Sequence, residues 1–340
     1  MKKVTILDIA KELNITFSTV ARALNDHPAI SATTKEAVKA AAAKLNYRQN
    51  KLASSLRSGK THIIGVIIPS IELNFFSSVV HGIEKVMNEN GYNVLLYQSN
   101  EMYTHEAKGI ETFLQSRVDG IIASIAMETT DLEHYREIKN KNIPLLLFDR
   151  TNAALAVPSV KIDDFRGGYL ATEHLIKQGY KSIAHITTQK SINIFSERLK
   201  GYKKALQTYN LPIDDRLIFY GKASIESGRS AIDHFYKEKI KFDAVFAVED
   251  FTALGAIQEL KTLGINVPEE VGVIGFANES FGAFITPTLS TVDQQTTKMG
   301  EEVAKLFLKL NKKQKFYEQA VEEIVLDPIL IERDSSVKSR

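Results

Sequence analysis

Apolar residues in the first fifty positions recur at helical spacing in three short segments. Steps of three and four residues place such positions on one face of an α-helix. The three stripes are Ile6, Ile9, Ala10 and Leu13, then Val20, Ala21 and Leu24, then Val38, Ala41, Ala42 and Leu45. The pattern therefore predicts three short helices, within 4–13, at about 17–25 and at 34–46.

Residues with strong turn and capping preferences separate these helices. Asn14 tolerates the left-handed conformation that closes a helix, and Thr16 suits the N-cap of the second helix. Pro28 bars that helix from continuing. Thr33 and Glu36 have the spacing of a capping box at the start of the third. Two short helices joined by a tight turn and closed by a third are typical of a helix-turn-helix DNA-binding domain, and also of a bland three-helix packing module.

From residue 61 onward, apolar runs of strand length alternate with amphipathic segments of helix length. Near-continuous apolar strands separated by helices indicate α/β architecture with doubly wound parallel sheets. The predicted strands are 63–68, 93–97, 119–124, 144–148, 183–187, 243–248 and 271–276, and the predicted helices lie near 75–90, 104–116, 131–141, 165–178, 197–209, 225–237 and 251–263.

Seven strand-helix units are too many for one compact lobe, and 149–159 is interpreted as a break between two lobes. In open α/β sheets, ligands bind beyond the carboxyl ends of the strands, so two facing lobes form a cleft. A single large α/β domain is the alternative.

Length and charge divide the chain in the same way. At 340 residues the chain exceeds the size at which one hydrophobic core stops growing, so two or three domains are expected. Residues 1–60 carry 11 Lys or Arg against 4 Asp or Glu, whereas 61–340 carry 32 against 37. A basic module on a mildly acidic body suits polyanion binding at one end, with a solvated basic face as the alternative.

Composition argues against several other kinds of chemistry. The chain contains no cysteine, which removes disulfides, thiolate metal sites and cysteine nucleophiles. The eight histidines show no metal-ligand spacing, and no glycine-rich nucleotide loop, GxSxG or HExxH motif occurs. The first residues lack a signal-peptide core, and no apolar run approaches a membrane span. We therefore expect a cytoplasmic protein without catalytic residues, cofactor or metal.

Four motifs follow one another in the basic segment: VTILDIA at 4–10, STVARALN at 18–25, LNY at 45–47 and LASSLR at 52–57. Together they resemble the headpiece and hinge of lactose-repressor/galactose-repressor (LacI) family regulators. The resemblance implies a headpiece over 1–48 and a hinge over 49–60 that becomes helical on DNA, with Leu56 wedged into the minor groove. It assigns DNA contacts to Thr5, Thr16, Phe17, Ser18, Thr19, Arg22, Asn25, Tyr47, Asn50, Ala53, Leu56 and Arg57.

Arg22 is the first candidate for base readout, because arginine can donate two parallel hydrogen bonds to guanine. A phosphate contact is the alternative. Two positions depart from the family pattern: Ala21 stands where serine is common, and Phe17 replaces a polar residue or tyrosine. A phenyl group makes no conventional hydrogen bond, so Phe17 would contact a thymine methyl group or a sugar, and the operator sequence is not deducible.

Further motifs run along the body: IPS at 68–70, FDR at 148–150, SERLKGY at 196–202, ALGA at 253–256, VIGF at 273–276, PTLSTV at 287–292 and IERDSS at 331–336. They resemble the periplasmic-binding-protein fold that forms the core of LacI-family regulators. The resemblance implies an effector-binding and dimerisation core over 61–340. Its first lobe would comprise 61–162 with 293–320, and its second lobe 163–292 with 321–331.

The resemblance also places a small effector between the lobes. Arg198 is the best single contact, since arginine suits planar, bidentate recognition; a surface ion pair is the alternative. Ala277-Asn278 stands where relatives often have Asp-Asp or Asp-Asn, so a neutral hexose cannot be assumed. A sugar, a sugar acid and a phosphorylated sugar all remain open. The assigned contacts are Ser70, Phe75, Asp149, Arg150, Arg198, Glu249 and Asn278.

These features predict a sequence-specific transcription regulator that binds a pseudo-palindromic double-stranded DNA operator and is switched by a carbohydrate-like effector. The resemblance to the family favours a repressor, and an activator is the alternative. Four residues follow Ser336, too few for the leucine heptads that make tetramers, so a homodimer is expected. A solute-binding protein, an enzyme on the same fold and a sequence-independent architectural DNA protein are the competing hypotheses.

Overall fold

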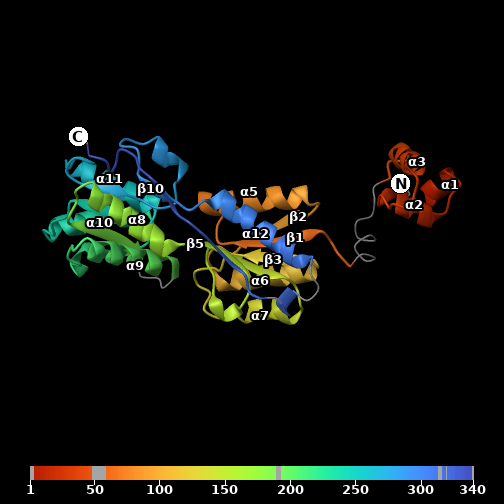
Figure 1. Cartoon of the computed structure of the whole chain (residues 1–340), viewed down its shortest axis with the longest axis horizontal. Helices are drawn as coiled ribbons and strands as arrows, with labels where there is room; N and C mark the ends of the chain where they lie inside the picture. Colours follow the sequence, from red (N-terminus) through yellow and green to blue (C-terminus); the bar gives the residue numbers. More distant parts are fainter. Residues whose placement is uncertain (1–3, 48–58, 189–192, 313–315, 319, 339–340) are drawn as a thin grey trace. The chain divides into compact units, whose positions relative to one another are not determined.

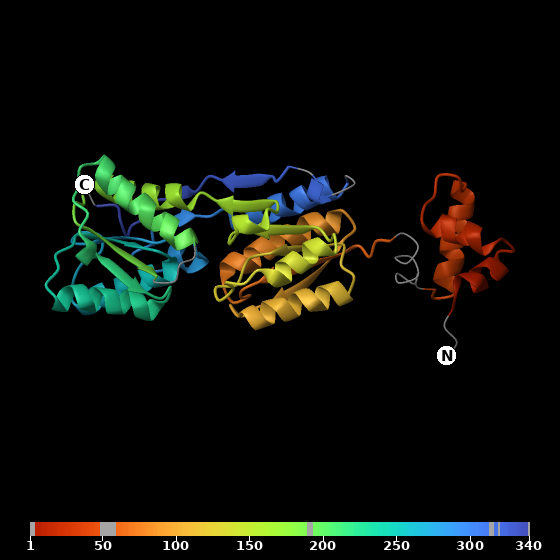
Figure 2. The same ribbon diagram turned by 90° about the horizontal axis from the view of Figure 1, so that it is seen from below.

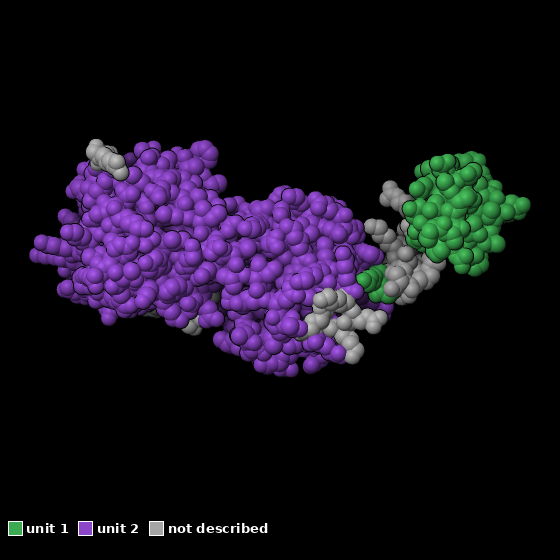
Figure 3. All heavy atoms as spheres, in the orientation of Figure 1, with its two compact units in different colours: residues 1–61 green, residues 62–340 purple. Residues whose placement is uncertain are grey.

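The computed structural model describes residues 4–47, 59–188, 193–312, 316–318 and 320–338. The chain divides into two compact units, residues 1–61 and 62–340 (Figures 1 and 3). The first unit is a three-helix bundle of α1 (Ile6–Glu12), α2 (Phe17–Leu24) and α3 (Ala32–Lys44). Its core is the predicted set of apolar stripes, with Ile9, Val20 and Val38 fully buried.

The headpiece helices begin and end at polar residues. Asn14 has a φ of 53°, and the N–H of Ile15 donates to the carbonyl of Ala10, which closes α1 as a Schellman motif. Thr16 caps α2 as predicted, its Oγ1 accepting from the N–H of Thr19 at 3.2 Å. The predicted cap at Thr33 is wrong.

The third helix begins one residue after Ser31, whose Oγ accepts from the N–H of Thr34 at 3.2 Å. Thr33 therefore lies inside the first turn. Ser31 and Thr34 have the same capping spacing as Thr33 and Glu36, and the earlier serine takes the cap. In α1, by contrast, the N–H and the hydroxyl of Thr5 both donate to Asp8 at 2.8 Å.

The first lobe of the second unit is built on a six-stranded sheet in the order β11-β5-β4-β3-β1-β2. Its strand pairs are all parallel, and helices cover both faces (Figure 1). Helices α5 and α12 pack together on one face, and α6 and α7 cover the other. The strands are β1 (Ile63–Ile68), β2 (Asn93–Gln98), β3 (Gly120–Ala123), β4 (Leu145–Phe148), β5 (Ser159–Ile162) and β11 (Glu323–Leu326), and the helices α5 (Asn74–Glu89), α6 (Tyr103–Gln115), α7 (Glu133–Asn140) and α12 (Thr296–Asn311).

The second lobe is built on a four-stranded parallel sheet in the order β7-β6-β8-β9. Helices α8 and α9 pack together on one face, and α10 and α11 on the other. The strands are β6 (Ile183–Thr188), β7 (Ile218–Gly221), β8 (Ala244–Ala247) and β9 (Gly272–Ile274), and the helices α8 (Asp164–Lys177), α9 (Asn193–Thr208), α10 (Ile225–Lys237) and α11 (Asp250–Thr262).

The chain passes between the lobes three times, and the crossing segments lie along one side of the unit (Figure 2). The first crossing is Asp163, between β5 and α8. The second is 294–295, between β10 (Thr291–Asp293) and α12, and the third is 327–328, between β11 and β12 (Ile329–Ile331). Strands β10 and β12 pair antiparallel beside the second lobe. Short 3₁₀ helices occur at Ala153–Leu155, Asp215–Leu217, Ser280–Ala283 and Phe316–Glu318.

Two predicted boundaries in this unit are wrong. Residues 149–159 do not separate the lobes, because β5 pairs with β4 in the first sheet. Strand β11 pairs with β5, so 323–326 belongs to the first lobe and not to the second. Strands β5 and β11 are each four residues long, and they pair with each other although they are remote in sequence, which local patterning does not reveal. In the parts of the chain that are described, no helix is long and apolar enough to span a membrane.

Candidate ligand cavity and nucleic-acid interface

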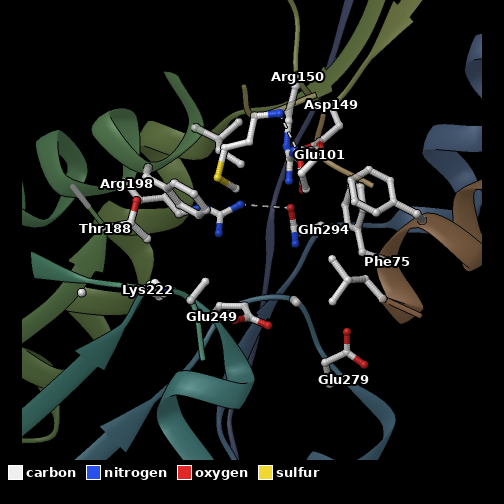
Figure 4. Close-up of a pocket in the computed structure, with 18 residues that line it drawn as sticks. Phe75, Glu101, Asp149, Arg150, Thr188, Arg198, Lys222, Glu249, Glu279 and Gln294 are labelled. Carbon is white, nitrogen blue, oxygen red and sulfur yellow. Dashed lines mark hydrogen bonds and ion pairs between the residues drawn. The ribbon is translucent and has the colours of Figure 1, made fainter. Parts of the chain in front are cut away.

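A cavity of about 420 Å³ lies where the carboxyl ends of the two sheets face each other (Figure 4). Loops at these ends form the binding crevice of open parallel sheets. Each lobe lines the cavity with residues that follow its strands. They are Glu101, Met127 and Asp149 after β2, β3 and β4, and Lys222, Glu249 and Ala277 after β7, β8 and β9.

Five of the seven predicted effector contacts line this cavity: Phe75, Asp149, Arg150, Arg198 and Glu249. That they bind a ligand stays a prediction. Ser70 and Asn278 do not line it, and their side chains bond elsewhere, Ser70 within its own loop and Asn278 to two other segments. The Oγ of Ser70 accepts from the N–H of Glu72 at 3.2 Å. Asn278 donates to Asp293 at 3.0 Å and accepts from Arg333 at 2.8 Å.

Arg198 on α9 is buried, with 3% of its surface exposed, so the alternative of a surface ion pair is wrong. Its Nε donates to Asp164 at 2.8 Å, its Nη1 to the carbonyl of Val248 at 2.8 Å and its Nη2 to Gln294 at 3.1 Å. The guanidinium also stacks 3.6 Å from the ring centre of Phe276. A planar, forked cation is needed to make these contacts at once, which lysine cannot do.

Arg150 holds the opposite wall of the cavity. Its Nη1 donates to both carboxylate oxygens of Glu101, at 2.7 and 2.9 Å. Glu101 in turn accepts from the backbone N–H of Met127 at 2.8 Å, so one carboxylate links the loops after β2, β3 and β4. The guanidinium of Arg150 also lies 5.4 Å from the ring centre of Phe76.

Burial changes the acidity of the carboxyl groups on both walls. It raises the pKa of Asp149 to about 7 and that of Glu249 to about 8. Asp250, behind the cavity, also has a pKa raised by burial to about 7, and it accepts from the N–H of Glu279 and the hydroxyl of Thr291, each at 2.7 Å. Strongly shifted carboxyl groups in a cavity are typical of functional sites.

The backbone at the cavity is strained. Asp149 has a φ of 57° and Asn278 a φ of 54°, both in the left-handed region. Ala277, between β9 and Asn278, has a φ of 127°, a conformation that residues with a side chain rarely adopt. Asparagine and aspartate tolerate the left-handed region, so the strain falls mainly on Ala277, where it costs on the order of 1–3 kcal/mol. Strained residues of this kind cluster at ligand sites.

The exposed face of α2 in the headpiece is separated from its buried face. Phe17, Ser18 and Arg22 are exposed, with Phe17 55% exposed, while Val20 and Ala21 are buried. A short helix that presents polar and aromatic side chains after a tight turn has the form of a recognition helix.

The other predicted headpiece contacts have structural roles. Thr5 and Thr16 cap helices, as described above, and the hydroxyl of Thr19 lies 2.9 Å from that of Thr16. The amide of Asn25 donates to the carbonyl of Ala21 at 2.9 Å, and Tyr47 packs against the headpiece core. DNA contact by these residues stays a prediction. Asn50, Ala53, Leu56 and Arg57, with the predicted hinge helix, lie outside the described residues.

Two family models match the chain. The one for bacterial regulatory proteins of the lacI family matches residues 5–50, and the one for periplasmic binding proteins and the sugar binding domain of the LacI family matches 61–322. The chain belongs to the LacI family. It is a DNA-binding transcriptional regulator with a ligand-binding core, as the sequence predicted.

Relatives of this LacI-family regulator match it over nearly its whole length. The HTH-type transcriptional regulator RegA of Clostridium saccharobutylicum is 34% identical over 336 residues, covering 98% of this chain and 99% of RegA. Catabolite control protein A of Priestia megaterium is 33% identical over 313 residues, covering 92% and 93%. The lac repressor dimer bound to operator and an anti-inducer has a TM-score of 0.86 at 26% identity, covering 99% of this chain and all of that one.

Sequence reasoning missed several residues of the regulator's cavity. Glu101 follows a predicted strand, so applying the carboxyl-end rule to every strand would have found it. Lys222 follows β7, which was not predicted, and Gln294 lies in a crossing between the lobes. Glu279 lies after β9, directly before the 3₁₀ helix at Ser280–Ala283, and no sequence signal points to it.

Proposed function

We propose that this regulator is a cytoplasmic homodimer that represses transcription from a pseudo-palindromic operator, and that a carbohydrate-like effector in the cavity controls its DNA affinity. Relatives support the parts that the fold alone leaves open. The HTH-type transcriptional repressor PurR of Yersinia pestis is 32% identical. CelR was solved with cellobiose and an Enterococcus faecium LacI-family regulator with ribose, at 26% and 28% identity. The proposal includes no catalytic step.

One observation carries the allosteric part of the proposal. Arg198 binds both Asp164, which directly follows the first crossing between the lobes, and Gln294, which lies in the second. The amide of Gln295 donates to the carbonyl of Asp327 in the third crossing at 2.5 Å. A ligand that contacts Arg198 therefore acts on the segments about which the lobes rotate, and hinge closure around ligand is a common switching motion.

The DNA-binding part rests on the exposed side chains of α2. We propose that Arg22 reads a base edge and that Phe17 contacts a thymine methyl group or a sugar. Loss of a good bidentate contact costs about 1–3 kcal/mol of base discrimination. Loss of a phosphate contact instead weakens binding nearly equally for all sequences.

The first experiment selects bound duplexes from a random pool with the full chain and with Arg22→Ala. We expect a palindrome from wild type, and loss of preference at one base pair in each half-site from the variant. Lys11→Ala, an exposed lysine of α1 outside the predicted set of contacts, is the control and should select the same site. Equal binding to all sequences by wild type would contradict the proposed function.

A further inference from the structure

The cavity contains carboxyl groups that the protein does not neutralise. Of the residues that the structure describes, four with carboxyl groups line it, Glu101, Asp149, Glu249 and Glu279, and three cations do, Arg150, Arg198 and Lys222. Arg150 is engaged by Glu101, and Arg198 by Asp164 outside the cavity. Lys222 is exposed to solvent. Both buried cations therefore already have a carboxylate partner, although the Nε of Arg150 is buried without a hydrogen-bond partner among the described residues. This pairing favours a cationic or neutral ligand over a phosphate or a carboxylate.

Glu249 is the clearest case of an unsatisfied acid. It follows β8, and its carboxylate is directed into the cavity between Lys222 and Glu279 (Figure 4). Its Oε2 is buried and has no hydrogen-bond partner among the described residues. A buried acceptor without a partner costs about 1–3 kcal/mol, and more when it is charged. Natural proteins keep such groups where a ligand supplies the missing partner.

The surroundings of Glu249 strengthen this conclusion. Burial, then the like charges of Asp250 and Glu279, raise its pKa to about 8, while Arg198 acts in the opposite direction. The remaining charged groups that line the same cavity are Glu101, Asp149, Arg150 and Lys222. Among the described residues, no group of three or more His, Asp or Glu is arranged to hold a metal ion. A cationic group of a ligand would stabilise the ionised form of Glu249, which burial disfavours.

We propose that Glu249 binds an ammonium group of the effector, which places the effector among the polyhydroxylated amines, such as amino sugars. This inference rests on the proposed function, in which the cavity binds the effector. The phenyl rings of Phe75 and Phe195 line the same cavity and suit the apolar face of a sugar ring or an adjacent cation. The ammonium pairs with the carboxylate of Glu249, which lines the cavity and whose Oε2 has no partner among the described residues.

The test uses the full chain and three pairs of probes that differ in one substituent. D-glucose, D-galactose and D-mannose are compared with D-glucosamine, D-galactosamine and D-mannosamine by titration calorimetry at pH 7. In at least one pair we expect the amino sugar to bind ten times more tightly or better. Glu249→Gln should reduce this preference to less than threefold, whatever its effect on the affinity for the neutral sugar. Glu238→Gln, an exposed glutamate of the same lobe, should keep the wild-type preference.

The pH dependence of binding separates an ammonium ligand from a neutral one. At pH 7 a carboxyl with a pKa of about 8 is mostly protonated, and an ammonium ligand releases that proton to the buffer. Affinity for the amino sugar should therefore rise nearly tenfold from about pH 6 to pH 7. A neutral sugar that accepts a hydrogen bond from the protonated acid shows no such rise. Asp149 titrates in the same range, so the slope is compared with that of Glu249→Gln, which retains Asp149.

Three results would overturn the inference: tighter binding of the neutral sugars, a preference for amino sugars that Glu249→Gln leaves intact, or no binding by any of the six probes. Glucuronate and glucose 6-phosphate serve as anionic probes. Tighter binding of either one than of the amino sugars would also contradict the inference. The proposed function is judged separately, by operator selection. If the protein selects a palindrome but prefers neutral sugars, the proposed regulator function stands and only the proposed ammonium site is wrong.

Discussion

At the scale of single residues, the cavity loops combine strained backbone with buried acids. Ala277 has a φ of 127° and lines the cavity, although glycine adopts that conformation without strain. Glu249, on the same side, is half-buried, and its Oε2 is buried without a partner among the described residues. Both features reduce stability in the empty protein, which is the usual cost of a preorganised ligand site.

Replacing Ala277 with glycine should relieve the backbone strain. We expect Ala277→Gly to raise the free energy of unfolding by about 1 kcal/mol, because a residue with a side chain is disfavoured at positive φ. Chemical denaturation of the full chain measures the change. Ala231→Gly, a buried alanine within helix α10, is the matched control and should lose stability. A loss of stability in Ala277→Gly as well would show that the loop is not strained.

The stability of the protein should depend on pH through Glu249. Its pKa is raised from about 4.5 to about 8 in the folded chain, so the folded state binds the proton more tightly than the unfolded state does. The contribution of Glu249 to stability is therefore fully present below about pH 4.5 and is lost as pH rises through about 8. Glu249→Gln should flatten this fall and raise the melting temperature by a few degrees at pH 9 but less at pH 6. An unchanged pH profile would contradict the shifted pKa.

At the scale of elements, Arg198 depends on the close packing of α8 against α9. A Cβ on Gly168 would lie 2.2 Å from the carbonyl oxygen of Arg198, and one on Gly201 would lie 2.1 Å from the carbonyl oxygen of Phe165. Two glycines, one on each helix, thus let the helix backbones touch. This contact holds Arg198 within reach of Asp164 at the start of α8.

Adding a methyl group at this contact should separate the helices. Gly201→Ala is expected to destabilise the protein by roughly 1–3 kcal/mol, the usual cost of overpacking, and to weaken ligand binding by displacing Arg198. Thermal unfolding and calorimetric titration measure the two effects. Lys200→Ala changes an exposed neighbour on the same helix and is the control. It should change the stability and the ligand affinity by much less than Gly201→Ala does. Full stability in Gly201→Ala would mean that the helices can shift without cost.

At the scale of the whole molecule, ligand binding and DNA binding are expected to be coupled through the crossings between the lobes. Arg198 bridges the first two crossings, and Gln295 bridges the second and third. Coupling between two sites is reciprocal, so DNA must change effector affinity by the same factor as effector changes DNA affinity.

Arg198→Lys should weaken this coupling. A lysine is a point charge and cannot hold Asp164, Val248 and Gln294 together. We expect operator affinity without effector to stay within threefold, while the change in affinity caused by effector falls at least tenfold, about 1.4 kcal/mol. Gln294→Ala, which removes only the contact to the second crossing, should show a smaller loss in the same direction. An undiminished effector response in both variants would place the coupling elsewhere.

The sequence by itself determined the local elements and the family. The three headpiece helices, Asn14 at the first turn and the Thr16 cap follow from spacing and from the conformational preferences of short polar side chains. The seven predicted strands and seven predicted helices of the core all occur, because long periodic segments carry their own signal. Arg198 was found through its motif, although sequence gave no sign of its partners.

Only the tertiary structure decided which distant segments meet. The pairing of β11 with β5 and the position of Gln294 beside Arg198 join residues more than ninety positions apart, and no local pattern records such contacts. That the Oε2 of Glu249 is buried and has no partner among the described residues became visible only in the folded chain, because burial and hydrogen bonding depend on the surroundings and not on the residue alone. The sequence thus determined the kind of protein, and the tertiary structure decided which residues meet in its cavity.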